Sequence, residues 1–176
     1  MASPYELLAG LALLREKKRG SSQQHRQELQ EWSGFQVQIG HVTCLIPCSQ
    51  VEEVVTPTTL ASVRGVAQWI SGLIYCRGQL VTLLDAAALL LGKPMPLAVG
   101  RVFVLRGMRE WFGLQTGNFE GVRHIWSDTP FCEPDTVLPA AWERYSRQWL
   151  LLDGRPVAVL DAMRLVLALE SEEWQP

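Results

Sequence analysis

The sequence predicts a mainly β protein made of two similar small lobes, with short capping helices and an N-terminal helical extension. Three observations predict this fold class. From Ser33 onward, apolar residues alternate with polar ones in short segments that end at glycine-containing turns. One hairpin-and-helix segment occurs twice along the chain. Apolar residues make up 48% of the 176 residues, enough for a sizeable core in one domain or in two lobes that share it.

Residues 1–32 predict the helical extension. Ser3 is placed as the N-cap, Pro4 as the first helical residue and Glu6 as the second half of a capping box. Leucines then recur at helical spacing, and the polar residues 23–32 are expected to form a second helical stretch. Two interpretations stay open: a mobile extension, or a helix whose leucine stripe docks on the body or on a partner.

Glycine-containing turns divide the remaining chain into strand pairs. The expected pairs are 34–39 with 42–46, 73–76 with 79–84, 101–105 with 110–115, and 149–152 with 155–160. Asp85 and Asp161 follow two of these pairs, and each is expected to cap a short helix. Residues 51–55 predict either a helical turn or a strand.

The internal repeat supports two lobes. A shift of 76 residues superimposes residues 75–86 on residues 151–162, and a weaker match at a shift of 68 places residues 52–54 over residues 120–122. The identities of the stronger match are Gly78/Gly154, Val81/Val157, Leu84/Leu160, Asp85/Asp161 and Ala86/Ala162. Each lobe is too small to bury its strands alone, so we expect two packed lobes with a boundary near residues 92–100.

Composition argues against several functional classes. The net charge is −2 and the densest basic stretch, residues 15–19, is short, which disfavours a nucleic-acid partner. The four cysteines form no C-x-x-C pair, so we expect free thiols in a reducing compartment and no metal site. The longest apolar run is far below the roughly 20 residues of a spanning helix. The start of the chain does not resemble a signal peptide, so the expected location is the cytoplasm.

Signals for catalysis are sparse. One Asp in each β-lobe could indicate an aspartic-protease pair, but a helix begins directly after Asp85 and Asp161, which favours two N-caps. The sequence has no nucleophile elbow and no phosphate-binding glycine loop, so we expect neither an enzyme nor a cofactor. Arg77 stands at an expected hairpin tip after an apolar strand. It is either a solvated turn residue or a cation that anchors an interface.

Several segments together match the signature of one known protein family. Residues 51–54 (VEEV) and 69–85 (WISGLIYCRGQLVTLLD) resemble that signature, whose centre reads G-x-x-N-L-R-G-x-x-x-P-x-x-D-L. Residues 112–122 resemble its second-lobe segment, and residues 152–165 resemble its closing hairpin and helix. On these segments the chain resembles the CheW family of chemotaxis coupling proteins. The resemblance covers residues 33–169. The extension and the overall length resemble the PilI-type branch, which serves chemosensory systems that control type IV pili.

The resemblance implies two SH3-like five-stranded β-barrels packed around a shared core, with residues 170–176 as a tail. It implies no catalysis. The implied partners are the cytoplasmic tip of a methyl-accepting chemoreceptor and the regulatory domain of a CheA-type histidine kinase, with recruitment to receptor arrays and self-association there. Two competing interpretations remain: a CheW-like structural subunit without a kinase partner, and an enzyme on a double-barrel fold.

The resemblance also implies which residues contact the partners. The first-lobe positions that match the family pattern are Val51, Glu53, Gly72, Arg77 and Gly78. The second-lobe positions are Gly113, Phe119 and Val122. The chain departs from the pattern at Tyr75-Cys76, where Asn-Leu is usual, and at Thr82, where Pro is common. The glycines could act by permitting close backbone packing rather than by touching a partner.

Overall fold

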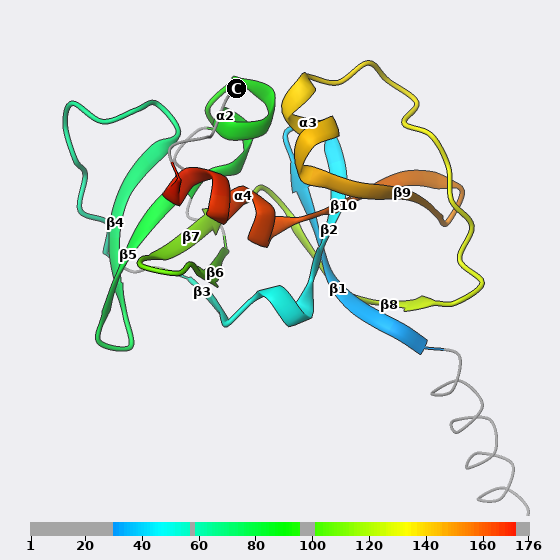
Figure 1. Ribbon diagram of the computed structural model, residues 1–176, viewed down its shortest axis with the longest axis horizontal. Helices are drawn as coiled ribbons and strands as arrows, with labels where there is room; N and C mark the ends of the chain where they lie inside the picture. The colour runs from blue at the N-terminus through cyan, green and yellow to red at the C-terminus, as the bar shows by residue number, and fades with distance from the viewer. Residues whose placement is uncertain (1–29, 57–58, 96–100, 172–176) are drawn as a thin grey trace, which may run out of the picture.

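The computed structural model describes residues 30–56, 59–95 and 101–171, which form two five-stranded sheets (Figure 1). The sheet of lobe A has the strand order β8-β1-β2-β10-β9, and the sheet of lobe B has the order β3-β6-β7-β5-β4. The strands of lobe A are β1 (Gln30–Ile39), β2 (Val42–Pro47), β8 (Phe119–Trp126), β9 (Ser146–Leu152) and β10 (Arg155–Leu160). The strands of lobe B are β3 (Glu53–Val55), β4 (Ile70–Cys76), β5 (Gln79–Asp85), β6 (Val102–Arg106) and β7 (Trp111–Gln115).

Short helical segments connect and cover the two lobes. They are η1 (Cys48–Gln50), α2 (Ala86–Leu91), α3 (Ala140–Tyr145) and α4 (Ala162–Glu170). The largest apolar cluster joins buried residues of both sheets with residues of α2, α3 and α4. Each lobe also has a smaller apolar interior of its own. The expected mainly β fold of two five-stranded lobes around a shared core is therefore confirmed.

The expected boundary near residues 92–100 is wrong. Along the chain, β1 and β2 belong to lobe A, the next five strands form lobe B, and the strands from Phe119 onward belong to lobe A again. The connections between the lobes are therefore residues 48–52 and 116–118. The physical reason is the parallel pairing of β2 with β10, in which Cys44 lies opposite Ala158. This long-range pairing closes lobe A with strands from both ends of the chain.

The two lobes share one topology despite this path. Each sheet contains two hairpins, which are β4–β5 and β6–β7 in lobe B and β9–β10 and β1–β2 in lobe A. The second strand of one hairpin pairs in parallel with the second strand of the other: β5 with β7, and β10 with β2. A single strand, β3 or β8, forms the remaining edge of the sheet. The stronger repeat superimposes β4–β5 on β9–β10. The match at a shift of 68 superimposes β3 on β8, and the same shift relates β6–β7 to β1–β2. The repeat thus indicated the two lobes correctly but not the order in which the chain builds them.

The repeated hairpins have the same turn. Arg77 and Gly78 have φ of 46° and 84°, and Asp153 and Gly154 have φ of 52° and 75°. Two successive residues with positive φ are typical of the type I′ turn, whose twist matches that of the flanking strands. Glycine at the second position of each turn avoids the penalty that a side chain meets there.

Both repeated aspartates cap helices, as the sequence predicts. The Asp85 carboxylate accepts hydrogen bonds from the backbone N–H of Ala87 (2.9 Å) and Ala88 (3.0 Å), and also from Met95 N–H (2.7 Å). The Asp161 carboxylate accepts from Arg164 N–H at 3.1 Å. These bonds give each carboxylate a structural role at a helix start.

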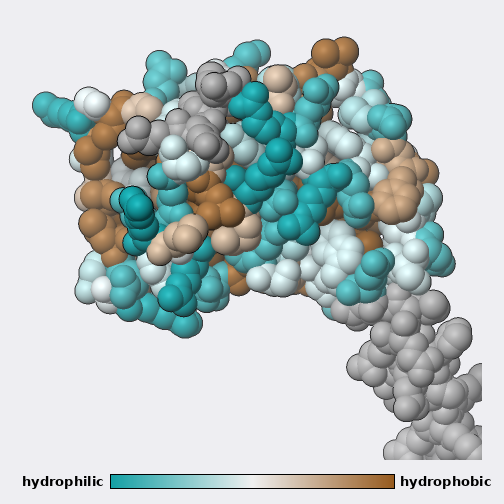
Figure 2. All heavy atoms as spheres, in the orientation of Figure 1, coloured by the Kyte–Doolittle hydropathy of each residue, from teal (hydrophilic) through white to brown (hydrophobic). Residues whose placement is uncertain are grey.

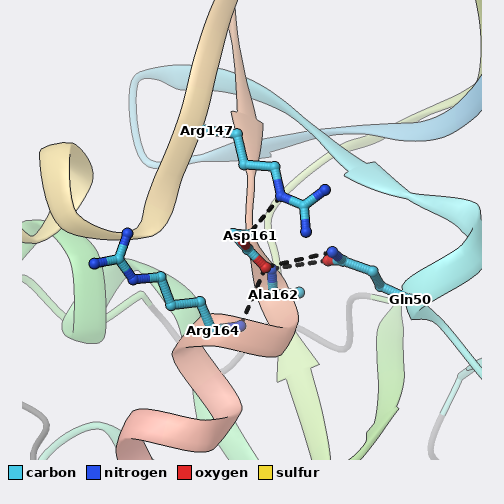
Figure 3. Close-up of polar contacts among 5 residues, drawn as sticks. All are labelled: Gln50, Arg147, Asp161, Ala162 and Arg164. Atoms are coloured by element: carbon cyan, nitrogen blue, oxygen red, sulfur yellow. Dashed lines mark hydrogen bonds and ion pairs between the residues drawn. The ribbon is translucent and has the colours of Figure 1, made fainter.

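The Asp161 carboxylate also joins the first inter-lobe connection to α4 (Figure 3). Arg147 Nε donates to its Oδ2 at 2.8 Å, and Gln50 Nε2 donates to its Oδ1 at 3.4 Å. The Gln50 side-chain oxygen in turn accepts from Ala162 N–H at 3.0 Å. Burial alone would raise the pKa of Asp161, but the bonds from Arg147 and from Arg164 N–H outweigh it, so the pKa lies below its ordinary value.

Two further expectations change. Strand β1 begins at Gln30, so residues 30–32 are strand rather than the end of a helix; they pair with β8. Segments 119–126 and 140–145 form β8 and α3, neither of which the turn pattern indicated. The remainder of the predicted helical extension lies outside the described residues, as do residues 172–176 of the tail.

Candidate functional site

An ion pair marks the outer end of lobe B. Arg77 Nε lies 2.8 Å from Glu53 Oε2, and the Arg77 side chain is 78% exposed. Cys76 Sγ donates to the same carboxylate oxygen at 3.4 Å. Partial burial, and then the hydrogen bond to Glu53, raise the pKa of the Cys76 thiol, so it remains protonated near neutral pH. The structure thus brings two of the predicted contact residues, Glu53 and Arg77, into direct contact.

Exposed apolar side chains flank this ion pair. Tyr75 and Leu80 lie opposite each other across the β4–β5 hairpin, and they are 76% and 60% exposed. We call Glu53, Tyr75, Arg77 and Leu80 the hairpin patch. Figure 2 shows further hydrophobic side chains gathered at the end of the molecule formed by β4 and the loop before it. Exposed apolar area around an arginine is typical of a protein-binding surface.

A shallow hollow lies beside the hairpin patch. It has a volume of about 390 Å³ and lies between the end of β3, the start of the following loop and β4. Its lining is mainly apolar and includes Leu73, Ile74 and Leu80. The patch therefore offers both a convex hairpin tip and an adjacent recess to a partner.

Gly72 shapes this surface from beneath. A Cβ atom there would lie 2.5 Å from the carbonyl oxygen of Ala61, and Gly72 has φ of +147°. The missing side chain lets the loop before β4 lie against the strand, where Ala61 and Leu73 exchange two backbone hydrogen bonds of 2.9 Å. Gly72 therefore supports the patch by permitting close backbone approach. Gly78 does so through the positive φ of the hairpin turn.

Gly113 lies inside lobe B, not on a second-lobe surface. Its neighbours are the interior side chains of β5 and β6: a Cβ atom would lie 2.6 Å from Val102 Cγ1 and 3.2 Å from Val81 Cγ1. Gly113 thus belongs to the lobe that carries Arg77, and it is buried. The position acts through packing in this structure.

Phe119 lies between the lobes. Its ring centroid is 6.2 Å from that of Phe35 in lobe A and 5.8 Å from that of Phe103 in lobe B, and those two centroids are 5.3 Å apart. The guanidinium carbon of Arg101 lies 5.1 Å from the Phe119 ring centroid. Phe119 is therefore only partly exposed and packs on the shared core. Its ring therefore contributes to the contact between the lobes.

Val122 and Val51 occupy equivalent segments in different settings. Val122 is 49% exposed on β8 and lies opposite Phe35 in the sheet. Val51 precedes β3, and its partly buried side chain packs on the shared core. Of the residues that the resemblance implies in lobe A, Val122 is therefore the one available to a partner. It is far along the chain from the hairpin patch and belongs to the other lobe.

Tyr75 and Leu80 were not among the predicted contact residues. A signal for them was present, because residues 73–76 and 80–81 are apolar at successive positions and only one face of a hairpin can point inward. The register places Tyr75 and Leu80 on the outer face. Their exposure follows from tertiary packing, which the sequence pattern does not specify.

Two further features of the described residues concern metal binding and membrane insertion. Within the described ranges, no group of three or more His, Cys, Asp or Glu side chains is arranged to hold a metal ion. Helices long and apolar enough to cross a membrane are likewise absent from the part of the chain that the structure describes.

Comparisons with known proteins identify the family. The family model of the CheW-like domain matches residues 33–170, so the chain belongs to the CheW-like domain family. It is 26% identical over 164 residues to Protein PilI of Pseudomonas aeruginosa. The aligned region covers 89% of this chain and 92% of that protein. The crystal structure of the scaffolding protein TtCheW from Thermoanaerobacter tengcongensis has the same fold. Its TM-score is 0.63 at 14% identity, over 76% of this chain and 86% of that chain.

Proposed function

We propose that this protein is a chemosensory adaptor that couples the cytoplasmic tip of a methyl-accepting chemoreceptor to the regulatory domain of a CheA-type histidine kinase. Membership of the CheW-like domain family supports a coupling or scaffolding role. The similarity to Protein PilI supports a system that controls type IV pili. In this proposal the protein is cytoplasmic and is recruited to receptor arrays, where copies also associate with one another.

The hairpin patch is the observation that carries the proposal. It combines exposed Tyr75 and Leu80 with Arg77, whose guanidinium is held by Glu53. An exposed ion pair of this kind contributes less than about 1 kcal/mol to stability. Its placement beside exposed apolar area therefore favours a role in binding, where arginine and aromatic side chains contribute most to affinity.

Adaptor function requires two surfaces held at a defined separation. The hairpin patch lies on lobe B, and Val122 provides an exposed apolar position on lobe A. The shared core and α4, whose two ends bond to different lobes, keep these surfaces in one geometry. We propose that one surface binds the receptor tip and the other binds the kinase domain, and that no bond is made or broken in the process.

The test is a titration of the purified protein with the kinase regulatory domain and, separately, with a receptor-tip fragment from the same organism. We expect saturable binding near micromolar, about −8 kcal/mol. Arg77→Glu should weaken one of the two interactions at least tenfold. It removes the exposed guanidinium from the hairpin patch and puts in its place a carboxylate that repels the Glu53 carboxylate. Lys93→Glu, an equal charge change at an exposed position after α2, is the matched control and should bind as the wild type does.

Two outcomes contradict parts of this proposal. If folded wild-type protein binds neither partner, the coupling function is wrong, and a CheW-like structural subunit without a kinase partner becomes the better description. If both partners bind but Arg77→Glu and Lys93→Glu behave alike, the coupling function stands and the hairpin patch is not its contact surface.

A further inference from the structure

Lobe A has a hollow at one end of its sheet that is lined by polar and charged side chains. Its volume is about 290 Å³. The lining includes Gln36, Gln38, Thr43, Glu120, Arg123 and Arg155. Val157, which belongs to the apolar interior of lobe A, forms part of the lining and is itself buried. Neither the hairpin patch nor Val122 belongs to this hollow.

The equivalent strand position in lobe B carries a tryptophan. In lobe B, Val81 lies opposite Trp111 across the β5–β7 pair, and Trp111 packs against the interior of that lobe. In lobe A the repeat counterpart of Val81 is Val157. The residue after it, Ala158, lies opposite Cys44, so the counterpart of Trp111 is Thr43. The hollow is therefore the place where one lobe carries an indole and the other carries a short hydroxylic side chain.

Hydrogen bonds and an ion pair join the side chains that line the hollow. Glu120 accepts hydrogen bonds from Gln36 Nε2 and from Gln38 Nε2, the latter at 3.1 Å. Arg123 Nε donates to Gln36 Oε1 at 2.7 Å, and its NH2 group lies 2.5 Å from Asp153 Oδ2. The counterparts of Gln36 and Arg123 in lobe B are Val104 and Val55. Lobe A thus has a polar network where lobe B has two valines, with Arg123 paired to Asp153 and the Glu120 carboxylate bonded to two glutamine amides.

This arrangement favours a flat, neutral occupant with a hydrogen-bonding edge. The charged side chains of the lining are two acidic (Glu120, Asp153) and two basic (Arg123, Arg155), so their formal charges sum to zero and leave little net field to attract an ion. Guanidinium groups, by contrast, attract the faces of aromatic rings, and the described residues include such contacts: Arg106 Cζ lies 5.9 Å from the Trp111 ring centroid, and Arg101 Cζ lies 5.1 Å from that of Phe119. The Thr43 hydroxyl can accept a hydrogen bond from an indole N–H or a phenol O–H.

We propose that the hollow of lobe A binds an exposed tryptophan or tyrosine side chain of a partner protein, which enters the place that Trp111 occupies in lobe B. The inference rests on the proposed function for the identity of the partner, the kinase regulatory domain. It adds a recognition site on the lobe opposite the hairpin patch. The two lobes then differ in a defined way: one end is closed by its own aromatic residue, and the other is completed by a residue supplied in trans.

The first experiment tests the hollow alone. Wild-type protein is titrated with N-acetyl-tryptophanamide while backbone amide resonances are recorded, and N-acetyl-leucinamide is the matched control ligand. We expect saturable shifts confined to amides around Gln38, Thr43 and Arg155 with the tryptophan ligand, and at least fivefold weaker binding of the leucine ligand. Absence of localised shifts, or equal binding of the two ligands, would overturn the proposal, as would tighter binding of inorganic phosphate at the same amides.

A second experiment places the tryptophan of lobe B at the matching position of lobe A. Thr43→Trp places in lobe A the residue that lobe B carries, and Thr43→Ser leaves the hollow open. We expect Thr43→Trp to abolish the shifts and to weaken binding of the kinase regulatory domain at least tenfold, with Thr43→Ser within twofold of the wild type. Circular dichroism checks that both variants fold. If Thr43→Trp does not fold, the titration of wild-type protein with the tryptophan ligand decides whether the hollow binds an aromatic side chain.

The two proposals fail in different ways. If wild-type protein binds the tryptophan ligand but not the kinase regulatory domain, the proposed partner is wrong and the aromatic-binding hollow stands. If it binds the kinase domain, and folded Thr43→Trp binds that domain as tightly as Thr43→Ser does, the coupling function stands and the hollow is not where the kinase domain is recognised.

Discussion

Gly113 offers a sharp test of the packing inside lobe B. A Cβ atom at this position would lie 2.6 Å from Val102 Cγ1, 3.2 Å from Val81 Cγ1 and 3.3 Å from Leu83 Cδ1, whereas ordinary contacts of a Cβ atom begin near 3.4 Å. Gly113→Ala therefore forces an extra methyl group into a filled interior. Overpacking of this kind destabilises proteins by about 1–3 kcal/mol. For a chain of this length, each kcal/mol lowers Tm by about 2–4 °C.

The clash can be relieved from the other side. Val102→Ala removes the Cγ1 atom and by itself should cost about 2 kcal/mol, from two lost methyl groups and the space they leave. The double variant should cost less than the sum of the single variants by about 0.5–3 kcal/mol. Lobe A supports this expectation, because its counterparts of Val102 and Gly113 are Gly34 and Leu45. The large and small residues have exchanged places.

The assay is urea unfolding followed by tryptophan fluorescence, in which the midpoint falls while the slope m stays unchanged. Gly113→Ala should retain binding to the kinase regulatory domain at temperatures well below its Tm. Strictly additive costs would refute the packing argument. Wild-type stability together with lost binding would instead make Gly113 a direct contact residue, as the family resemblance implies.

Two further substitutions separate structural from binding roles. Phe119→Asp should lower the free energy of unfolding by roughly 3–5 kcal/mol, because it removes a large ring from the contact between the lobes; thermal melting checks this, and an unchanged Tm would mean that Phe119 is a surface residue. Glu170 accepts hydrogen bonds from the N–H groups of Arg109 (2.8 Å), Met108 (2.9 Å) and Glu110 (3.1 Å), which lower its pKa below the ordinary 4.5. The resulting stabilisation is complete above pH 4.5 and is lost as the pH falls through the lowered folded pKa. The Tm difference between the wild type and Glu170→Gln should therefore be largest near pH 7 and shrink on acidification, and a pH-independent difference would contradict this origin.

The sequence by itself determined the local elements of this protein. Interactions between residues close in sequence determine three kinds of element: the turns at Arg77-Gly78 and Asp153-Gly154, the strands on each side of them, and the two aspartate caps. Glycine tolerates positive φ, and a carboxylate satisfies free N–H groups at a helix start. The repetition of these elements was enough to predict two similar lobes, because the same short-range interactions stabilise the turn and the helix cap in each copy.

Only the tertiary structure decided which strands share a sheet and which side chains face outward. The pairing of Cys44 with Ala158 joins strands more than a hundred residues apart and leaves no local signal, so the boundary between the lobes was misplaced. The same packing buried Gly113 and left Tyr75 exposed, although both lie in apolar segments. Burial is a property of the assembled lobes. It depends on which faces of the sheets meet, and the spacing of apolar residues along one strand does not contain that information.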